Sequence, residues 1–403
     1  MRDVNEMKVC MLAEKLPPEF TGSGRQAAFL GKSLIGKNVE VVGLCSNPND
    51  QSDKDMSWGF PIFRLHTSSK KRIRSLEFAI KSTIWLLRNK GKYDILHVHG
   101  YCSGGLMGSI VAKKLGKKAI YKITLPGEDD PEALYQSRLG KLKILLLKQF
   151  DALVSISNRV QKCTEDFGIK NVRNYTIPNG VDERFCLNET ANREARRELI
   201  AKYQLDKDAR IILFMGSIEY RKGVDVLARA WPWIVSQVPE SRLLMVGPFF
   251  EQTNFHQQLV SLLGEHLGRT VLLVGNVSDP ERYYRASDVF VFPSRNESFG
   301  NVLTEAMACG TACVAADIKG VTTSIITNGY DGLIVESEDP NGLGNAILSI
   351  LRKPELRNRL TGNAVKTVDE HFKIECIAEK YVDLYKLLLG ERRRSYWNVG
   401  KSK

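Results

Sequence analysis

The stretch KVCMLAEKLPPEFTGSGRQAAFLGKSLIGKNVEVVGL, residues 8–44, decides the fold class of this chain of 403 residues. It begins with a short apolar strand and passes through a turn that contains the glycine motif GSG. A helical pattern and a second apolar strand follow. These four segments are residues 8–13, 17–24, 25–35 and 39–44. A strand, a glycine loop, a helix and a strand in this order predict the start of a doubly wound parallel sheet, and so an α/β fold.

Further short apolar segments continue this pattern along the chain and predict more buried parallel strands. They lie at residues 94–99, 118–123, 152–156, 210–215, 242–246, 271–274, 289–292 and 312–315. A polar, charged segment separates the third from the fourth, after which the pattern restarts. We therefore expect two α/β domains, at residues 1–185 and 186–372, and an amphipathic helix with a basic tail at 373–403.

The net charge of the chain is concentrated in its first half. Apolar residues make up 43% of the sequence and charged residues 26%, as in ordinary globular proteins. The formal net charge is +12. Residues 1–185 hold 30 Lys and Arg against 19 Asp and Glu, whereas residues 186–403 hold 28 against 27. The basic excess predicts that the first domain, and not the second, meets an anionic partner.

Several classes of protein are disfavoured by the composition. No run of about 18 apolar residues predicts a transmembrane helix. The first residues lack the basic start and apolar stretch of a signal peptide. The eight cysteines include no CxxC pair, so we expect neither a zinc site nor a disulfide framework. Free thiols in a reducing compartment fit a cytoplasmic protein.

The glycine motif of the opening stretch imitates a dinucleotide-binding fingerprint, in which Gly22, Gly24 and Ala27 would take the conserved positions. That fingerprint needs an acidic residue near the end of the second strand to hold the ribose. Here the strand ends in LCS, and no acid follows before Asp50. We therefore do not expect a nicotinamide cofactor.

The stretch PSRNESFGNVLTEAMACG, residues 293–310, carries the strongest candidate site. A buried strand runs into a polar turn, and a helix is predicted to begin near Asn301, where free backbone N–H groups suit a phosphate. Glu297 precedes this helix and Glu305 lies in its second turn. The two carboxylates could contact different parts of one elongated ligand. Alternatively, Glu297 only caps the helix and Glu305 is a surface charge.

A second stretch, GSIEYRKG at residues 216–223, supplies cations. Arg221 and Lys222 lie where a glycine-flanked loop meets the start of a helix. Fixed N–H donors and two positive side chains together suit a diphosphate, although adjacent basic residues are often merely solvated. Doubly wound topology brings this loop and the acidic stretch to the same edge of the sheet.

Together these motifs resemble those of the retaining GT-B glycosyltransferases of family 4. The spacing of Glu297 and Glu305 resembles the E-x7-E motif of that family, and five further stretches match in order along nearly the whole chain. They are GSG at 22–24, ILHVH at 95–99, IPNGVD at 177–182, RKG at 221–223 and NGYDGL at 328–333. The resemblance implies two Rossmann-like doubly wound domains that face each other across a cleft, and a final helix that crosses back to the first domain.

The resemblance also implies a reaction. A hexosyltransferase of this family moves a sugar from a nucleotide diphosphate sugar, here a UDP or GDP sugar, with retention of the anomeric configuration. It needs no metal ion and no other cofactor. Arg221 and Lys222 would neutralise the leaving diphosphate, and Glu297 would contact the donor sugar. The other donor-binding positions that the resemblance implies are Glu305, which would hold the ribose, Phe299, Gly300, Asn301, Gly22, Ser23 and Gly24.

The chain departs from the family pattern at two positions that concern the donor. Ser217 stands where many relatives have an arginine, so that Arg221 would carry more of the phosphate charge. The segment TLPG, residues 124–127, replaces a T-x-H-G stretch whose histidine meets the donor sugar. Asp129 and Asp130 follow it; they could contact sugar or acceptor hydroxyls, or they could belong to a solvated loop.

Two segments of the first domain contain both basic and apolar residues and indicate what kind of acceptor the protein uses. They are residues 70–92 and 138–148. Basic residues that flank apolar and aromatic ones fit a helix on an anionic membrane surface. The alternative is two core helices with solvated basic faces. The membrane interpretation predicts a peripheral enzyme on the inner face of the membrane, with a lipid-linked or cell-surface glycan precursor as its acceptor.

Three other functions would account for some of these features. A GT-B epimerase or phosphorylase would share the same site, and the missing histidine would also fit a nucleotide-sugar-binding protein without transfer activity. A nucleic-acid-binding protein would explain the charge. However, the sequence has no zinc finger, RNP-like aromatic motif or basic zipper, so we expect no nucleic acid partner.

Overall fold

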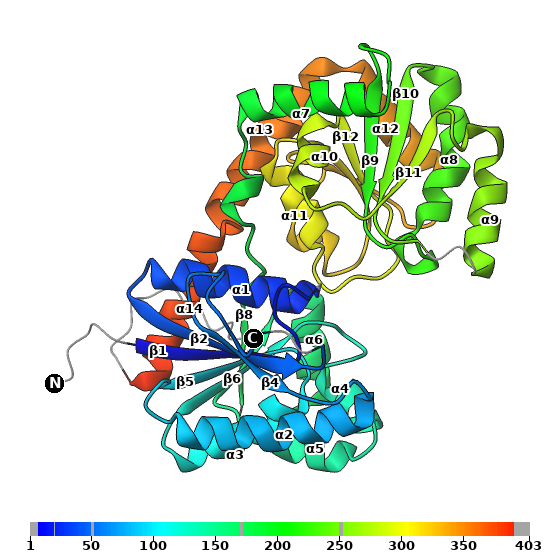
Figure 1. Ribbon diagram of the computed structural model, residues 1–403. Helices are drawn as coiled ribbons and strands as arrows, with labels where there is room; N and C mark the ends of the chain where they lie inside the picture. The colour runs from blue at the N-terminus through cyan, green and yellow to red at the C-terminus, as the bar shows by residue number, and fades with distance from the viewer. Residues whose placement is uncertain (1–6, 20, 50–51, 170–171, 250–252, 391–403) are drawn as a thin grey trace. The chain divides into compact units, whose positions relative to one another are not determined.

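The computed structural model describes residues 7–19, 21–49, 52–169, 172–249 and 253–390, which form two compact units. One unit comprises the described residues up to Gly180 together with those from Ile374 onward. The other runs from Val181 to Lys373. The boundary between the units therefore lies at 180/181, five residues before the position that the sequence pattern suggests. Figure 1 shows the elements of each unit.

The first unit is built on an eight-stranded sheet with the order β3-β4-β2-β1-β5-β6-β7-β8. All pairs are parallel except β3 with β4. The strands are β1 Met7–Ala13, β2 Val39–Asn47, β3 Lys54–Asp55, β4 Ile62–His66, β5 Ile95–His99, β6 Lys118–Ile123, β7 Ala152–Ser155 and β8 Arg173–Thr176. The helices are α1 Gly22–Ile35, α2 Lys71–Arg88, α3 Ser103–Lys114, α4 Pro131–Gln136, α5 Gly140–Leu147, α6 Asn158–Phe167 and α14 Ile374–Leu389.

Helices cover both faces of this sheet. The helices α1 and α14 pack together on one face, and α2, α3 and α5 lie on the other (Figure 1). The final helix α14 is anchored by Tyr385, whose hydroxyl lies 2.8 Å from Nδ1 of His97 on β5. Both side chains are fully buried. The histidines of the ILHVH stretch therefore lie in the core of this unit, and burial holds the pKa of His97 well below its usual value.

The second unit contains a six-stranded parallel sheet with the order β11-β10-β9-β12-β13-β14. Its strands are β9 Arg210–Met215, β10 Ser241–Val246, β11 Val271–Gly275, β12 Val289–Phe292, β13 Ala312–Ala316 and β14 Leu333–Val335. Its α-helices are α7 Glu189–Lys202, α8 Val224–Gln237, α9 Asn254–Leu263, α10 Pro280–Ala286, α11 Asn301–Ala308, α12 Pro340–Arg352 and α13 Pro354–His371. The short 3₁₀ helices of the unit are η1 Glu183–Phe185, η2 Tyr220–Lys222, η3 Gly264–His266 and η4 Thr322–Ser324.

The prediction of an α/β protein with two doubly wound parallel sheets is confirmed. In the first sheet the chain changes the direction in which it adds strands at β1, and in the second it does so at β9. Crevices at such switch points are where open α/β sheets bind ligands. No helix among the described residues has both the length and the apolar character needed to span a membrane.

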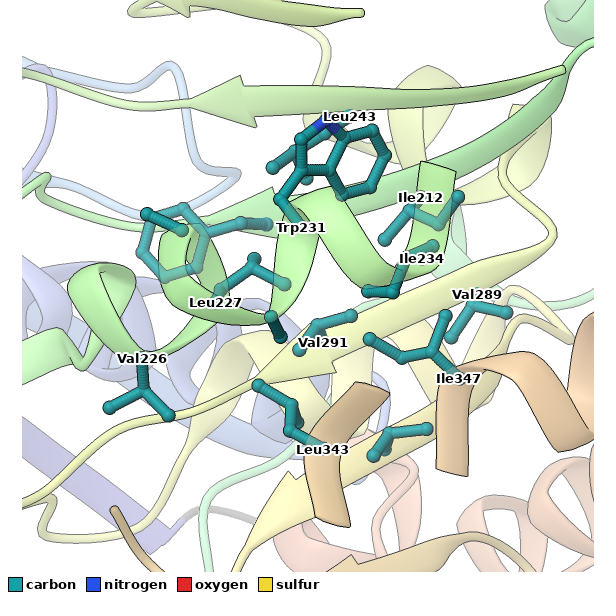
Figure 2. Packing of buried hydrophobic residues seen from close by; sticks show 14 of the residues in the cluster. Ile212, Val226, Leu227, Trp231, Ile234, Leu243, Val289, Val291, Leu343 and Ile347 are labelled. Atoms are coloured by element: carbon teal, nitrogen blue, oxygen red, sulfur yellow. The ribbon is translucent and has the colours of Figure 1, made fainter. Parts of the chain in front are cut away.

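The core of the second unit fixes β9 and β12, the two strands that precede the candidate site. Figure 2 shows Leu227 and Trp231 of α8 packed with Leu343 of α12 against side chains of the sheet, among them Val289 and Val291 of β12. Burying these aliphatic and aromatic groups contributes a large share of the stability of the unit.

Replacement of Leu227 by Ala is expected to lower the free energy of unfolding by about 2–5 kcal/mol, because it removes a fully buried side chain and leaves a cavity. Denaturant unfolding followed by tryptophan fluorescence measures this. The matched control is Leu262→Ala, whose side chain is 40% exposed and should lose well under half as much. Equal losses in the two variants would contradict this account of the core.

Candidate active site

The acidic loop follows β12 directly and ends at a helix start, as the sequence predicts. Helix α11 begins at Asn301, and its N-cap is Gly300, whose φ of +101° is a left-handed conformation that L side chains rarely adopt. A Cβ at Gly300 would also lie only 3.2 Å from the ring of Phe292. The backbone therefore requires glycine at the start of this helix.

Glu297 lies beside both predicted cations. Its Oε1 accepts hydrogen bonds from Nζ of Lys222 at 2.5 Å and from Oγ of Ser294 at 3.0 Å. Nη1 of Arg221 is 3.7 Å from Oε2. The side chains of Glu297 and Lys222 are both largely buried. The alternative that Glu297 only caps α11 is wrong, since the N-cap is Gly300 and the carboxylate is paired with lysine.

The cation loop lies at the same edge of the sheet because its strand is the neighbour of β12. Strands β9 and β12 pair in parallel, and the chain leaves β9 through Gly216 and the short helix η2. Gly223 has a φ of +67° and forms the N-cap of α8. A Cβ there would lie 1.9 Å from the carbonyl oxygen of Pro293. The two loops thus touch at a point where only glycine fits.

Arg295 holds these loops together, a role that the spacing of motifs does not indicate. Its backbone N–H donates to the carbonyl of Arg221 at 2.9 Å. Its guanidinium donates two hydrogen bonds, of 2.6 and 2.8 Å, to the carboxylate of Asp225 in the first turn of α8. Its Nη2 also donates a hydrogen bond of 2.9 Å to Oε2 of Glu338. The guanidinium lies over the ring of Tyr220, with Cζ 3.8 Å from the ring centroid.

The pKa shifts of Arg295 and Asp225 favour the charged form of both side chains. We call this ion pair the clamp. Burial opposes ionisation of Asp225, but the hydrogen bonds and charge of Arg295 hold the pKa of Asp225 below its usual value. Hydrogen bonds to Asp225 and Glu338 raise the pKa of Arg295. A bidentate pair of this kind fixes both orientation and distance.

Glu305 and Phe299 are buried at the same end of the second unit. Oε2 of Glu305 accepts a hydrogen bond of 3.1 Å from the hydroxyl of Tyr284. Phe299 packs edge-on against Phe372 with ring centroids 6.0 Å apart. The alternative that Glu305 is a surface charge is wrong, because only 7% of the residue is exposed. Sequence reasoning missed Ser294 and Tyr284, which are ordinary polar residues in their local contexts.

The prediction that Gly22, Ser23 and Gly24 form a loop is wrong. They are the first residues of α1, since Thr21 acts as N-cap and its hydroxyl accepts a hydrogen bond of 3.1 Å from the N–H of Gly24. A Cβ at Gly24 would lie 2.4 Å from the carbonyl oxygen of Lys15. The glycine is therefore required by close backbone approach, and the motif presents a helix N-terminus.

Asp129 and Asp130 are buried and serve the backbone of their own loop. Asp129 accepts hydrogen bonds from the N–H and hydroxyl of Thr124, at 2.8 and 2.6 Å, and from the N–H of Leu125 at 2.7 Å. Asp130 caps α4 through the N–H groups of Glu132 and Ala133. A solvated loop is thus the wrong interpretation of these acids. Their contact with a sugar or acceptor stays a prediction.

The structure brings Arg221, Lys222 and Glu297 together in one unit. The positions Gly22, Ser23, Gly24, Asp129 and Asp130 belong to the other unit. Among the described residues, no three His, Cys, Asp or Glu side chains gather closely enough to hold a metal ion.

Two family models match the chain. Residues 20–185 match "Glycosyltransferase Family 4", and residues 195–367 match "Glycosyl transferases group 1". Among curated proteins, the chain is 25% identical over 373 residues to N-acetyl-alpha-D-glucosaminyl L-malate synthase of Bacillus anthracis, covering 91% of this chain and 94% of that protein. It is 31% identical over 300 residues to D-inositol 3-phosphate glycosyltransferase 2 of Catenulispora acidiphila, covering 70% and 67%.

Solved structures share the fold along almost the whole chain. Sucrose-phosphate synthase of Thermosynechococcus elongatus aligns with a TM-score of 0.77 and 23% identity, over 95% of this chain and 99% of that one. HepE of Anabaena, in complex with UDP and glucose, aligns with a TM-score of 0.71 and 18% identity, over 94% and 99%. The GT-B fold predicted from the sequence is confirmed.

Replacement of Arg295 by Ala is expected to lower the free energy of unfolding by about 2 kcal/mol, because the largely buried Asp225 then loses its bidentate partner. The matched control is Arg269→Ala, which breaks an exposed pair with Glu265 and should cost under about 0.5 kcal/mol. Denaturant unfolding compares the two. A cost no larger for Arg295→Ala than for the control would contradict the clamp.

The buried carboxyl of Asp129 predicts a pH dependence. Burial raises the pKa of Asp129 to about 6, against hydrogen bonds from Thr124 and Leu125 that lower it. The folded chain therefore binds a proton at Asp129 more tightly than the unfolded chain does. The stability that this protonation contributes is fully present below the usual pKa range of a carboxyl group and is lost as the pH rises through 6. The free energy of unfolding of wild type, relative to that of Asp129→Asn, should fall by about 2 kcal/mol between pH 4 and 7 in denaturant unfolding experiments. A difference that does not change with pH would contradict it.

Proposed function

This chain belongs to the group 1, family 4 glycosyltransferases, and we propose that it moves a sugar from a nucleotide diphosphate sugar to an acceptor with retention of anomeric configuration and without a metal ion. The observation that carries the proposal is the contact of Lys222 with Glu297 at 2.5 Å, with Arg221 adjacent, on loops that follow β9 and β12. These loops lie at the strand-order switch point of the second sheet.

The proposed roles follow from charge. As the bond between the sugar and the diphosphate stretches, negative charge grows on the leaving phosphate oxygens, and cations already in place stabilise it. Lys222 and Arg221 supply two positive charges, and Glu297 orients Lys222 before the donor binds. In the proposed complex, Glu297 also meets the donor sugar and Glu305 holds the ribose hydroxyls.

A nucleotide sugar is supported as donor by the UDP and glucose named with HepE, and glycosyl transfer by the names of the curated relatives. We propose a UDP or GDP sugar. The proposed acceptor is a lipid-linked or cell-surface glycan precursor, and the proposed location is the cytoplasm, peripheral to the inner face of the membrane. The basic excess of residues 1–185 supports this location.

Two other functions share the site. An epimerase or phosphorylase would use the same diphosphate contacts, and a binding protein would use them without turnover. A screen of UDP, GDP and ADP sugars for hydrolysis, epimerisation, transfer to phosphate and transfer to a glycan acceptor by the wild-type chain separates them. Transfer to an acceptor supports the proposal, whereas tight binding without turnover of any donor would contradict it.

Replacement of Lys222 or of Glu297 by Ala is expected to lower kcat at least about 100-fold, because each removes part of the charge arrangement that acts on the leaving diphosphate. Turnover of the best donor from the screen measures this, with a chelator present throughout to test independence of metal ions. Lys207→Ala, which removes an exposed lysine from the same unit, is the control and should be fully active. Retained activity in both site variants would refute the assignment.

A further inference from the structure

Helix α2 presents a continuous apolar stripe to solvent. Its inward face is formed by Phe78, Ser82 and Leu86, all fully buried. The outward face carries five large aliphatic side chains at helical spacing, each more than 40% exposed: Ile73, Leu76, Ile80, Ile84 and Leu87. Over these positions the stripe is about 21 Å long. A surface helix ordinarily has polar residues on the side opposite its buried face.

Helix α5 repeats this feature on the same side of the sheet. Leu142 and Leu145 are 48% and 57% exposed, whereas Ile144, Leu146 and Leu147 face inward. Leu139, the N-cap of α5, is 66% exposed and adopts a left-handed φ of +63°, which is uncommon for leucine. Both α2 and α5 pack against α3 (Figure 1). We call the exposed side chains of α2 and α5, with Leu139, the apolar ridge.

The apolar ridge lies in a strongly basic part of the chain. Residues 70–92 contain eight Lys and Arg and one acid, Glu77. Residues 137–148 contain four Lys and Arg and no acid. Most of these cations are exposed, including Lys71, Arg72 and Lys90. Isolated exposed aliphatics are ordinary, but a row of them bordered by charge of one sign marks an interaction surface.

We propose that the apolar ridge docks the first unit onto an anionic lipid bilayer. The aliphatic side chains enter the boundary between headgroups and acyl chains, and the surrounding lysines and arginines contact the anionic headgroups, as in interfacial amphipathic helices. The inference rests on the proposed membrane location and names the surface responsible for it.

The charge balance favours a bilayer over two other partners. A second copy of the chain would place twelve basic residues opposite twelve others, with only Glu77 and the Glu14 that pairs with Arg74 to compensate them in each copy, and like charges repel. A nucleic acid would satisfy the cations but would leave the aliphatic row of α2 in water. Of these three partners, only the anionic bilayer, with its apolar interior, matches both features.

Sedimentation of the full chain with vesicles tests the proposal. Wild type is expected to bind vesicles of phosphatidylcholine and phosphatidylglycerol, to bind pure phosphatidylcholine much more weakly, and to be released partly by salt. The triple variant Leu76→Ser, Ile80→Ser, Ile84→Ser should bind anionic vesicles at least about tenfold more weakly. The matched control, Ile35→Ser, Leu187→Ser, Leu262→Ser, changes three exposed aliphatics elsewhere and should bind as wild type does.

The outcomes are distinguishable from those of the proposed function. Absence of wild-type binding to anionic vesicles, or equal binding by the two triple variants, would overturn the docking surface. A concentration-dependent dimer that the ridge variant abolishes, without vesicle binding, would assign the ridge to a second copy instead. Donor hydrolysis by wild type without vesicles is measured separately: hydrolysis without vesicle binding overturns the docking surface alone, and vesicle binding without hydrolysis contradicts only the transferase.

Discussion

The candidate site depends on the contact between two loop backbones, at Gly223 and Pro293. A Cβ at Gly223 would overlap the carbonyl oxygen of Pro293, so the loops after β9 and β12 can approach this closely only with glycine at that position. The clamp of Arg295 on Asp225 then fixes the same two loops through side chains. With backbone and side chains both constrained, Lys222 and Glu297 meet at 2.5 Å. Preorganisation of this kind lowers the cost of arranging charges when a ligand arrives.

Much of the fold could be predicted because parallel strands covered on both faces are almost wholly apolar. The runs at β9 and β12 have this character, and the start of α11 at Asn301 was predicted correctly. Strand β8, RNYT, was not predicted, since it lies at the sheet edge and carries polar residues. Helix α1 was predicted to begin three residues too late, because one capping hydroxyl, that of Thr21, outweighs the low helix propensity of two glycines.

The candidate site, like the fold, could be predicted from the sequence only in part. The pairing of Glu297 with cations follows from motifs on neighbouring strands, and sequence spacing is enough to suggest it. The functions of Arg295 and Asp129 depend on which groups lie opposite them, 70 residues away in the first case and on the loop backbone in the second. Which groups come to lie opposite these two side chains is determined by the packing of the whole core, so a local sequence pattern cannot predict it.

The two halves of the chain use their charges differently, and this explains the uneven net charge. In the second unit the important cations are already paired: Lys222 with Glu297, and Arg295 with Asp225. In the proposed complex, a diphosphate would compete with Glu297 for Lys222, which favours a ligand that carries more than one negative charge. Around the apolar ridge, twelve cations are accompanied by Glu77 and by Glu14, which pairs with Arg74, so a large positive excess remains and its field extends into solvent. A field of that kind acts on an extended anionic surface more effectively than on a single small ligand, because every cation contributes at once.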